Sequence, residues 1–293
     1  MAAASTREGE ATAENLTVEA ANDITYAYRR YGKADTAAPP LLFLQHFRGN
    51  LDNWDPLLVD TIAKQREVNL LDNTGVGLSS GVVPRTVTET ARDAISFCDA
   101  LGLAEIDLLG YSLGGMVAQD VALLRPQLVR RLVLAGTGPR GGGQLMHGWA
   151  PDVARIAKAD DNGLDEVLWL FFEHTESSRE LGRAFLGRLG ERKENRDQPN
   201  GDQVKAAQYD AVVEWGIPDR SQLNRLAGIR QPTLVANGDN DTMIPTINSH
   251  ILGEHLPNAR VRIFPDAGHG FLFQWPVEFA EVVTSFLAEG EGA

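Results

Sequence analysis

The sequence predicts an α/β protein with a mostly parallel, eight-stranded sheet flanked by helices and interrupted by one helical insertion. Short apolar runs of strand length alternate with amphipathic segments of helical length through most of the 293 residues, which is typical of strand–helix–strand units. The alternation stops after the sixth expected strand and resumes near residue 231. A chain of this length with 43% hydrophobic residues can fill one large core and also carry an insertion. We therefore expect a disordered tail over 1–15, a core over 16–137 and 231–293, and a helical cap over 138–230.

The charge balance and the N-terminal residues restrict the class of protein. A formal charge of −13 opposes binding to phosphate backbones, and no basic stripe is present. No run approaches the roughly 18 apolar residues that a membrane span needs, and residues 1–15 contain no apolar segment typical of a signal peptide. The single cysteine, Cys98, cannot form a disulfide within the chain. We expect a cytoplasmic protein that acts on a small molecule and binds neither nucleic acid nor membrane, with an oligomeric state that the sequence leaves open.

The first hundred residues predict a hairpin, two buried strands and a helix. Two β-prone runs, 16–20 and 24–31, lie on either side of an Asn-Asp turn and predict an antiparallel hairpin. The wholly apolar run at 41–44 is typical of a strand buried on both faces, and a second strand is expected at 68–71. An amphipathic segment then predicts a helix over 87–101, with Cys98 on its apolar face. We expect a structural role for this cysteine.

The fifth expected strand leads directly into a glycine-bounded serine. The run at 106–109, which is apolar apart from Asp107, is followed by Gly110-Tyr111-Ser112-Leu113-Gly114 and then by a helical pattern. A nucleophile held at φ > 0 on so sharp a turn leaves no room for side chains two residues before or after it, which explains the two glycines. The turn exposes the Ser112 hydroxyl above the sheet, and it directs the Leu113 N–H to where an oxyanion could sit.

A helical block follows the sixth expected strand at 128–135. Its clearest helix has apolar residues at i, i+3, i+4, i+7 and i+8, beginning at Leu164. The glycine-rich segment 136–141 matches the dinucleotide fingerprint in form, but a proline interrupts it and no helix opens at its third glycine, so we interpret it as a hinge. The alternation then resumes with expected strands at 233–236 and 261–264, each followed by a loop and a helix.

An acid and a histidine follow the last two strands. The loop Gly238-Asp239-Asn240-Asp241 precedes Pro245 and offers two candidate acids, Asp241 and Asp239. The loop after the eighth strand contains His269 between two glycines, which let the imidazole project into a site. Because the carboxyl ends of parallel strands share one edge of the sheet, we expect Ser112, the acid and His269 to meet there.

These patterns resemble the α/β-hydrolase family over about residues 16–290. The resemblance implies a catalytic triad in which Ser112 is the nucleophile, His269 the base and Asp241 the acid that orients the base. It also implies that the insertion covers the active site. No metal or organic cofactor is required by this chemistry, and His250 and His255 are not spaced as metal ligands on one helical face.

The resemblance further implies an oxyanion hole and a pocket. Leu113 supplies one N–H donor, and Phe47 the other, since Gln45-His46 stands where many relatives have His-Gly before the donor residue. His46 has three interpretations, namely a residue at the mouth of the site, a packing residue or a base. Arg48 is interpreted either as a solvated arginine or as a partner for a substrate carboxylate. The candidate substrate-binding residues are His46, Arg48, Tyr111, Trp149, Trp169 and Phe172.

A serine nucleophile disfavours the epoxide hydrolases and haloalkane dehalogenases of this fold, because these use a carboxylate. We expect hydrolysis of a carboxylic ester or lactone with an apolar acyl part, through an acyl-enzyme. Three alternatives stay open: a cofactor-free, haloperoxidase-like perhydrolase, a carbon–carbon bond hydrolase, and a ligand receptor without turnover. The sequence does not specify the substrate, because the shape of the pocket depends on how the insertion sits.

Overall fold

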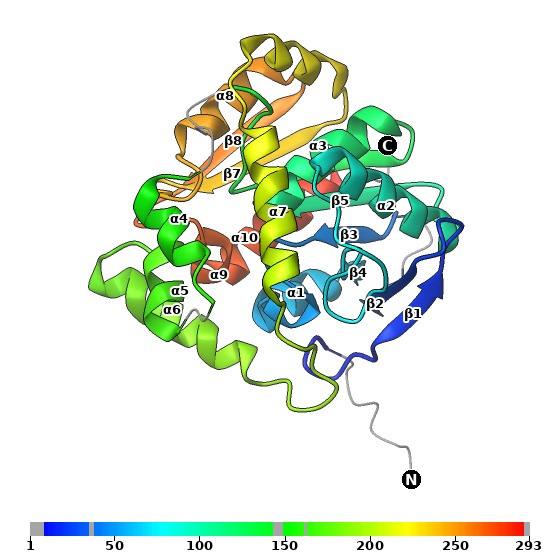
Figure 1. Ribbon diagram of the computed structural model, residues 1–293, viewed down its shortest axis with the longest axis horizontal. Coiled ribbons are helices and arrows are strands. Elements are labelled where there is room, and N and C mark those ends of the chain that lie inside the picture. Colours follow the sequence, from blue (N-terminus) through cyan, green and yellow to red (C-terminus); the bar gives the residue numbers. More distant parts are fainter. Residues whose placement is uncertain (1–8, 35–37, 143–148, 161–162, 290–293) are drawn as a thin grey trace.

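The computed structural model describes residues 9–34, 38–142, 149–160 and 163–289. Its centre is one eight-stranded sheet in the order β1-β2-β4-β3-β5-β6-β7-β8 (Figure 1). The first two pairings, β1 with β2 and β2 with β4, are antiparallel, and the remaining pairs are parallel. This confirms the predicted α/β fold class and its mostly parallel sheet. The strands are β1 (Leu16–Glu19), β2 (Thr25–Gly32), β3 (Leu41–Leu44), β4 (Glu67–Leu71), β5 (Ile106–Tyr111), β6 (Val129–Ala135), β7 (Thr233–Gly238) and β8 (Ala259–Phe264).

Helices cover both faces of the sheet because successive strand residues point to opposite sides. Along β3, Leu42 and Leu44 join one apolar cluster, whereas Leu41 and Phe43 join the other. The helices around this core are α1 (Pro56–Ala63), α2 (Val87–Ala100), α3 (Leu113–Leu124), α8 (Ile247–His255), α9 (Phe271–Gln274) and α10 (Pro276–Ala288), with a short 3-10 helix, η1 (Leu51–Asn53). Cys98 is buried in α2, where burial raises the pKa of its thiol to about 12. The thiol is therefore protonated at neutral pH.

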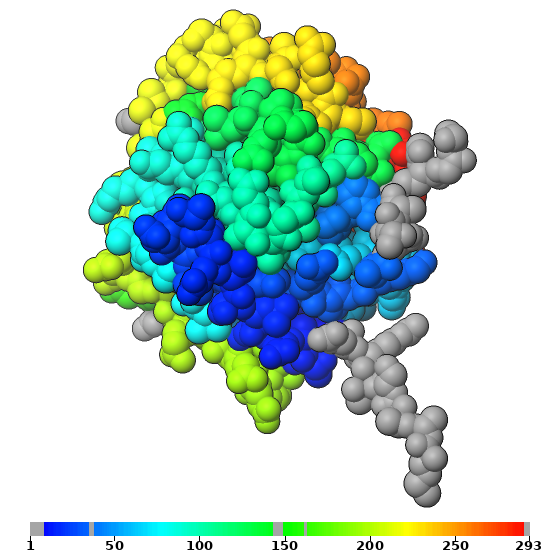
Figure 2. Space-filling model, turned by 90° about the vertical axis from the view of Figure 1, so that its right-hand side faces the viewer, coloured from blue at the N-terminus to red at the C-terminus, as the bar shows by residue number. Residues whose placement is uncertain are grey.

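The β1–β2 hairpin lies at the edge of the sheet. It contacts α2 and is visible in dark blue on the surface in Figure 2. Within the described ranges, no helix is both long and apolar enough to cross a bilayer.

Residues 138–230, which we call the insert, connect β6 to β7. They contain α4 (Pro151–Ala157), α5 (Leu164–Phe171), α6 (Glu176–Leu189), α7 (Asp202–Trp215) and the 3-10 helix η2 (Arg220–Gly228). In Figure 1, α4, α5 and α6 lie together beside the sheet, and α7 runs from them across the molecule to contact α2. The apolar stripe expected from Leu164 forms α5, whose Leu168 and Leu170 are buried.

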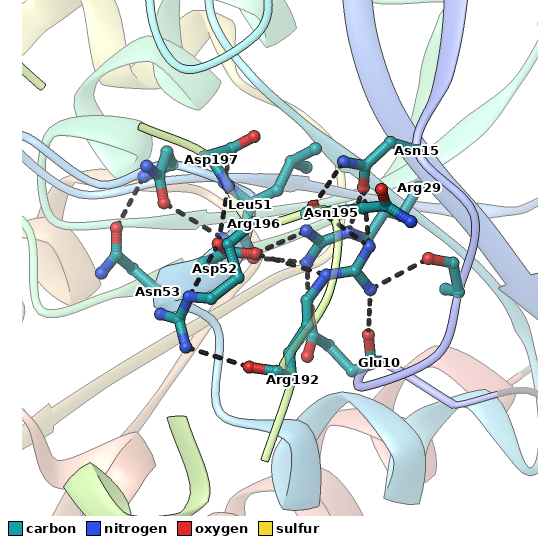
Figure 3. Close-up of polar contacts among 12 residues, drawn as sticks. Glu10, Asn15, Arg29, Leu51, Asp52, Asn53, Arg192, Asn195, Arg196 and Asp197 are labelled. Atoms are coloured by element: carbon teal, nitrogen blue, oxygen red, sulfur yellow. Dashed lines mark hydrogen bonds and ion pairs between the residues drawn. The ribbon is translucent and has the colours of Figure 1, made fainter. Parts of the chain in front are cut away.

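Two polar segments, 9–15 and 191–201, contain residues that are buried against the core. The expected tail over 1–15 does not describe residues 9–15, because Glu10 and Ala13 are buried. Residues 191–201 have the polar composition typical of a solvent-exposed loop. Two of them, Arg192 and Asp197, are nevertheless buried. The cause is an ion-pair network around the fully buried Arg29 of β2, which bonds Glu10 and Asp52 (Figure 3). Residues 1–8 lie outside the described residues.

The network makes stability depend on pH. Burial, opposed by Arg29 and Arg192, raises the pKa of Glu10 from 4.5 to about 7. The folded protein therefore holds this proton more tightly than the unfolded chain, and the resulting stabilisation is complete below pH 4.5 and lost as the pH rises through 7. We expect the free energy of unfolding, measured with urea at pH 5 to 8, to fall over this range. Glu10→Gln is expected to reduce the fall, and an unchanged pH slope in that variant would contradict the assignment.

Candidate active site

Ser112 sits between the end of β5 and the start of α3, with its backbone in the left-handed region at φ 57°. The two glycines of the motif are required by close packing. A Cβ at Gly110 would overlap the carbonyl of Gly114, and a Cβ at Gly114 would overlap the carbonyl of Leu44 on β3. The strained turn is thus held between β5, β3 and the first turn of α3, and it presents the Ser112 side chain to a cavity.

The structure brings Ser112, His269 and Asp241 together in one hydrogen-bonded chain. His269 Nε2 lies 2.9 Å from Ser112 Oγ, and His269 Nδ1 lies 2.7 Å from Asp241 Oδ2. All three residues are buried. The ionised carboxylate can only accept, so Nδ1 carries the proton and Nε2 is free to accept from the serine hydroxyl. This is the arrangement in which a neutral histidine can take the proton of an attacking serine.

Backbone groups fix the acid and the base in place. The second carboxylate oxygen of Asp241, Oδ1, accepts from the backbone N–H groups of Met243 and Ile244, at 2.8 and 2.9 Å. Tyr111 donates its hydroxyl to the carbonyl of His269 at 3.1 Å. These contacts leave Oδ2 of Asp241 directed at the imidazole.

Asp239, the alternative acid, has a different position. Its carboxylate accepts from the backbone N–H groups of Asp266 and Ala267, both at 3.1 Å. It therefore shapes the loop that carries His269 and makes no hydrogen bond to the imidazole.

Two backbone N–H groups beside the serine are unused. Neither the Phe47 nor the Leu113 N–H has a hydrogen-bond acceptor within the described ranges. Leu113 opens α3, where the helix dipole favours negative charge, and Phe47 lies in the loop after β3. The pair corresponds to the predicted oxyanion donors and could receive a developing oxyanion.

His46 lines the same cavity as a neutral side chain. Its Nδ1 lies 2.8 Å from the Phe47 carbonyl, to which it donates, and its ring packs edge-on against Tyr111 and Phe171. Burial lowers the pKa of His46 to about 4. Its Nε2 has no partner among the described residues and is left as an acceptor. His46 makes no hydrogen bond to Asp241 or Ser112, as a catalytic base would.

Arg48 also lines the cavity, but its guanidinium is occupied. It donates to the carbonyls of Ala157, Ala159 and Asp160 at the end of α4. These contacts differ from both predicted interpretations, a solvated side chain and a partner for a substrate carboxylate. A substrate carboxylate would have to compete with three backbone carbonyls for this side chain.

The cavity has a volume of about 430 Å³ and lies between the core and the insert. Ser112, His269 and Met243 line it from the core, and the apolar wall comes mainly from α5 and α6. The members of this wall are Val167, Leu170, Phe171, Phe185, Leu186 and Leu189. A polar end is formed by Asn50, Asp52, Asn53, Arg196, Asp197 and Asn200.

Four predicted substrate-binding residues are not among those that line the cavity. Tyr111 is wholly buried between His46 and His269, and Trp149 packs on Phe47 and Tyr209. Trp169 lies against His174, and Phe172 against Phe185. The apolar spacing of α5 carries the signal for Val167 and Phe171, which lie on the same stripe as the predicted residue Phe172. The spacing does not indicate which part of a broad apolar stripe faces a ligand.

Comparisons with known proteins identify relatives that share this fold. A model of the family described as alpha/beta hydrolase fold matches residues 39–276. A solved alpha/beta hydrolase fold protein from Chitinophaga pinensis is 39% identical with a TM-score of 0.89, covering 96% of this chain and 100% of that one. A 2-hydroxymuconate semialdehyde hydrolase of Pseudomonas putida is 30% identical over 78% of this chain and 79% of its own length. The structure of Est816, an N-acyl homoserine lactone degrading enzyme, is 26% identical with a TM-score of 0.72, covering 92% of this chain and 100% of that one.

Proposed function

The chain belongs to the α/β-hydrolase family, and on that premise we propose that it is a serine hydrolase that cleaves a carboxylic ester or lactone of a small, largely apolar substrate. The observation that carries the proposal is the hydrogen-bonded chain from Ser112 through His269 to Asp241, with distances of 2.9 and 2.7 Å. A pure ligand receptor would not need this arrangement of nucleophile, base and acid.

The reaction proceeds in two halves. Ser112 Oγ attacks the substrate carbonyl while His269 Nε2 takes its proton, and Asp241 stabilises the imidazolium that forms. The Phe47 and Leu113 N–H groups donate hydrogen bonds to the oxyanion, and each such donor contributes about 3 to 4 kcal/mol in other serine enzymes. His269 then gives its proton to the leaving alkoxide, which departs and leaves an acyl-serine. Water, deprotonated by His269, attacks the acyl carbon. The bond between the acyl carbon and Ser112 Oγ then breaks, the acid is released, and His269 returns the proton to Ser112 Oγ.

The cavity supports a compact, neutral acyl group. Its volume of about 430 Å³ falls within the usual range for small-molecule sites, and the α5 and α6 side chains make its wall apolar. The Arg48 guanidinium is bound to backbone carbonyls, which argues against a carboxylate at that position. The similarity to a lactone-degrading enzyme supports a lactone or ester in particular. The insert would serve as the cap that keeps water from this cavity.

A carbon–carbon bond hydrolase is the second candidate, favoured by the similarity to the 2-hydroxymuconate semialdehyde hydrolase. The same triad could serve it. Turnover of p-nitrophenyl butyrate compared with that of a vinylogous diketone separates the two activities. The one buried cysteine suits a reducing compartment, and we propose a cytoplasmic location.

We expect an organophosphonate ester to form one covalent adduct on Ser112. The hydroxyl is activated by His269, so the probe should react at this serine and stop the turnover of p-nitrophenyl butyrate. Intact-protein mass spectrometry measures the adduct, and Ser112→Ala should show none. Ser80→Ala is the control, because this serine lies in a loop outside the cavity and should leave labelling unchanged. If Ser112→Ala retained both labelling and turnover, the proposal would be refuted.

A further inference from the structure

Arg48 adopts a backbone conformation that is unfavourable for arginine. Residues 46–49 form a tight turn in which the Gly49 N–H donates to the His46 carbonyl at 3.0 Å, and Arg48 occupies its third position at φ 63°. A turn with positive φ at this position normally carries glycine or asparagine there. A non-glycine residue in this region is strained, so surrounding contacts must hold the turn in place.

The insert contacts the backbone N–H, the backbone carbonyl and the guanidinium of Arg48. Its N–H donates to Gln208 Oε1 of α7 at 2.6 Å, and its carbonyl accepts from Asn200 Nδ2 at 2.7 Å. Its guanidinium bonds the carbonyls of Ala157, Ala159 and Asp160 at 3.2, 2.8 and 3.2 Å. Three separate parts of the insert therefore converge on one residue of the core.

The core braces the same turn from below. Gln45 Oε1 accepts from the His46 N–H at 2.9 Å, and its side chain fills the space where a Cβ at Gly49 would lie. The turn is thus held between Gln45 of the core and the contacts of Arg48 with the insert. Phe47, whose N–H is unused, lies inside this turn and next to Arg48.

We propose that Arg48 is a positioning residue that couples docking of the insert to assembly of the oxyanion hole. With the insert docked, its contacts hold Arg48 in the left-handed conformation and so orient the Phe47 N–H toward the reacting carbonyl. When the insert moves away, the turn relaxes and the donor is misplaced. The inference rests on the proposed function, because it assigns Phe47 as an oxyanion donor. It makes catalysis conditional on a closed cavity, which protects the acyl-enzyme chemistry from bulk solvent.

The test compares two variants at one position. We expect Arg48→Ala to lower kcat for p-nitrophenyl butyrate about 10- to 100-fold with KM changed less than about threefold, because misplacing a transition-state donor affects kcat. The rate of phosphonate labelling should fall by a similar factor. Arg48→Gly lacks the guanidinium too, but glycine adopts φ 63° without strain. It should retain at least about threefold more kcat than Arg48→Ala.

Two further variants keep the test decisive. Gln208→Ala leaves Arg48 in place and removes only the acceptor of its N–H, so kcat should fall about fivefold at unchanged KM. Arg183→Ala removes an exposed arginine of the insert that pairs with Glu176, and should leave kcat unchanged. Thermal unfolding of each variant verifies that it is folded.

Failure of this inference is distinct from failure of the proposed function. If Arg48→Ala keeps kcat and labelling within threefold of the parent, or if Arg48→Gly is as slow as Arg48→Ala, the coupling is overturned while the hydrolase assignment stands. If the parent itself neither turns over the ester nor labels at Ser112, the proposed function is the one that fails.

Discussion

Asp241→Asn is expected to lower kcat for p-nitrophenyl butyrate about 10⁴-fold, as loss of the acid does in other triads. Oδ1 of Asp241 already accepts two backbone N–H groups, so an asparagine would keep its oxygen there and direct its NH₂ group at His269. That group is a donor, and it favours the tautomer with the proton on Nε2. The imidazole could then no longer take the proton of Ser112. Steady-state kinetics measure the loss, and circular dichroism verifies that the fold is intact.

Asp239→Asn is the matched control on the same loop. Asp239 bonds the N–H groups of Asp266 and Ala267 and does not contact His269. Asparagine retains one acceptor oxygen, so kcat should fall no more than about tenfold, and stability should fall by roughly 1 kcal/mol. Equal losses in the two variants would show that both carboxylates act only by shaping the loop, and Asp241 would lose its assigned role.

Local chain geometry explains why the fold and the three triad positions could be predicted from sequence. Gly110 and Gly114 are required by contacts within a few residues of Ser112 and with the adjacent strand β3, so their spacing appears as a short motif. Most of the buried parallel strands are short, largely apolar runs that alternate with segments of helical pattern, which predicts the sheet. The choice of Asp241 over Asp239 comes instead from the resemblance to the α/β-hydrolase family, whose acid loop matches Gly238, Asp241 and Pro245 in register.

Which residues line the cavity depends on how each helix of the insert is oriented about its own axis. An apolar stripe in the sequence does not determine this orientation. Phe171 lines the cavity and packs edge-on against His269, whereas Phe172, the next residue, packs on Phe185 inside the insert. Both residues fit the same stripe in the sequence. Likewise, nothing local to Arg48 indicates that its guanidinium bonds carbonyls more than a hundred residues away.

Residues 9–15 are packed against the core by contacts with residues that are distant in sequence. Their small, polar composition predicts a disordered segment. It does not reveal that Arg29 lies fully buried on β2 and needs carboxylate partners. Glu10 supplies one partner and Asp52 the other, while Asn15 accepts from Arg29 Nε at 2.8 Å (Figure 3).

Arg29→Met is therefore expected to destabilise the protein by about 3 to 5 kcal/mol, because breaking a buried ion pair leaves a charge uncompensated. Methionine retains an apolar stem of similar length but cannot donate to Asp52, which is held at 2.5 Å in the parent. Arg192 and Arg196 lie farther from Asp52, at 3.7 and 3.4 Å, and can offset only part of the loss. Urea denaturation measures the change in the free energy of unfolding.

The adjacent residue provides the control. Arg30 lies on the same strand, but its side chain is 40% exposed and pairs with Glu67 at 2.9 Å. Arg30→Met should cost less than about 1 kcal/mol, since water screens an exposed pair. Limited proteolysis gives a second measurement, because residues 9–15 and 191–197 are both held through the Arg29 network and should become susceptible together in Arg29→Met alone. If the two substitutions destabilise the protein equally, or if only one of the two segments is cleaved, burial of Arg29 is not what joins them to the core.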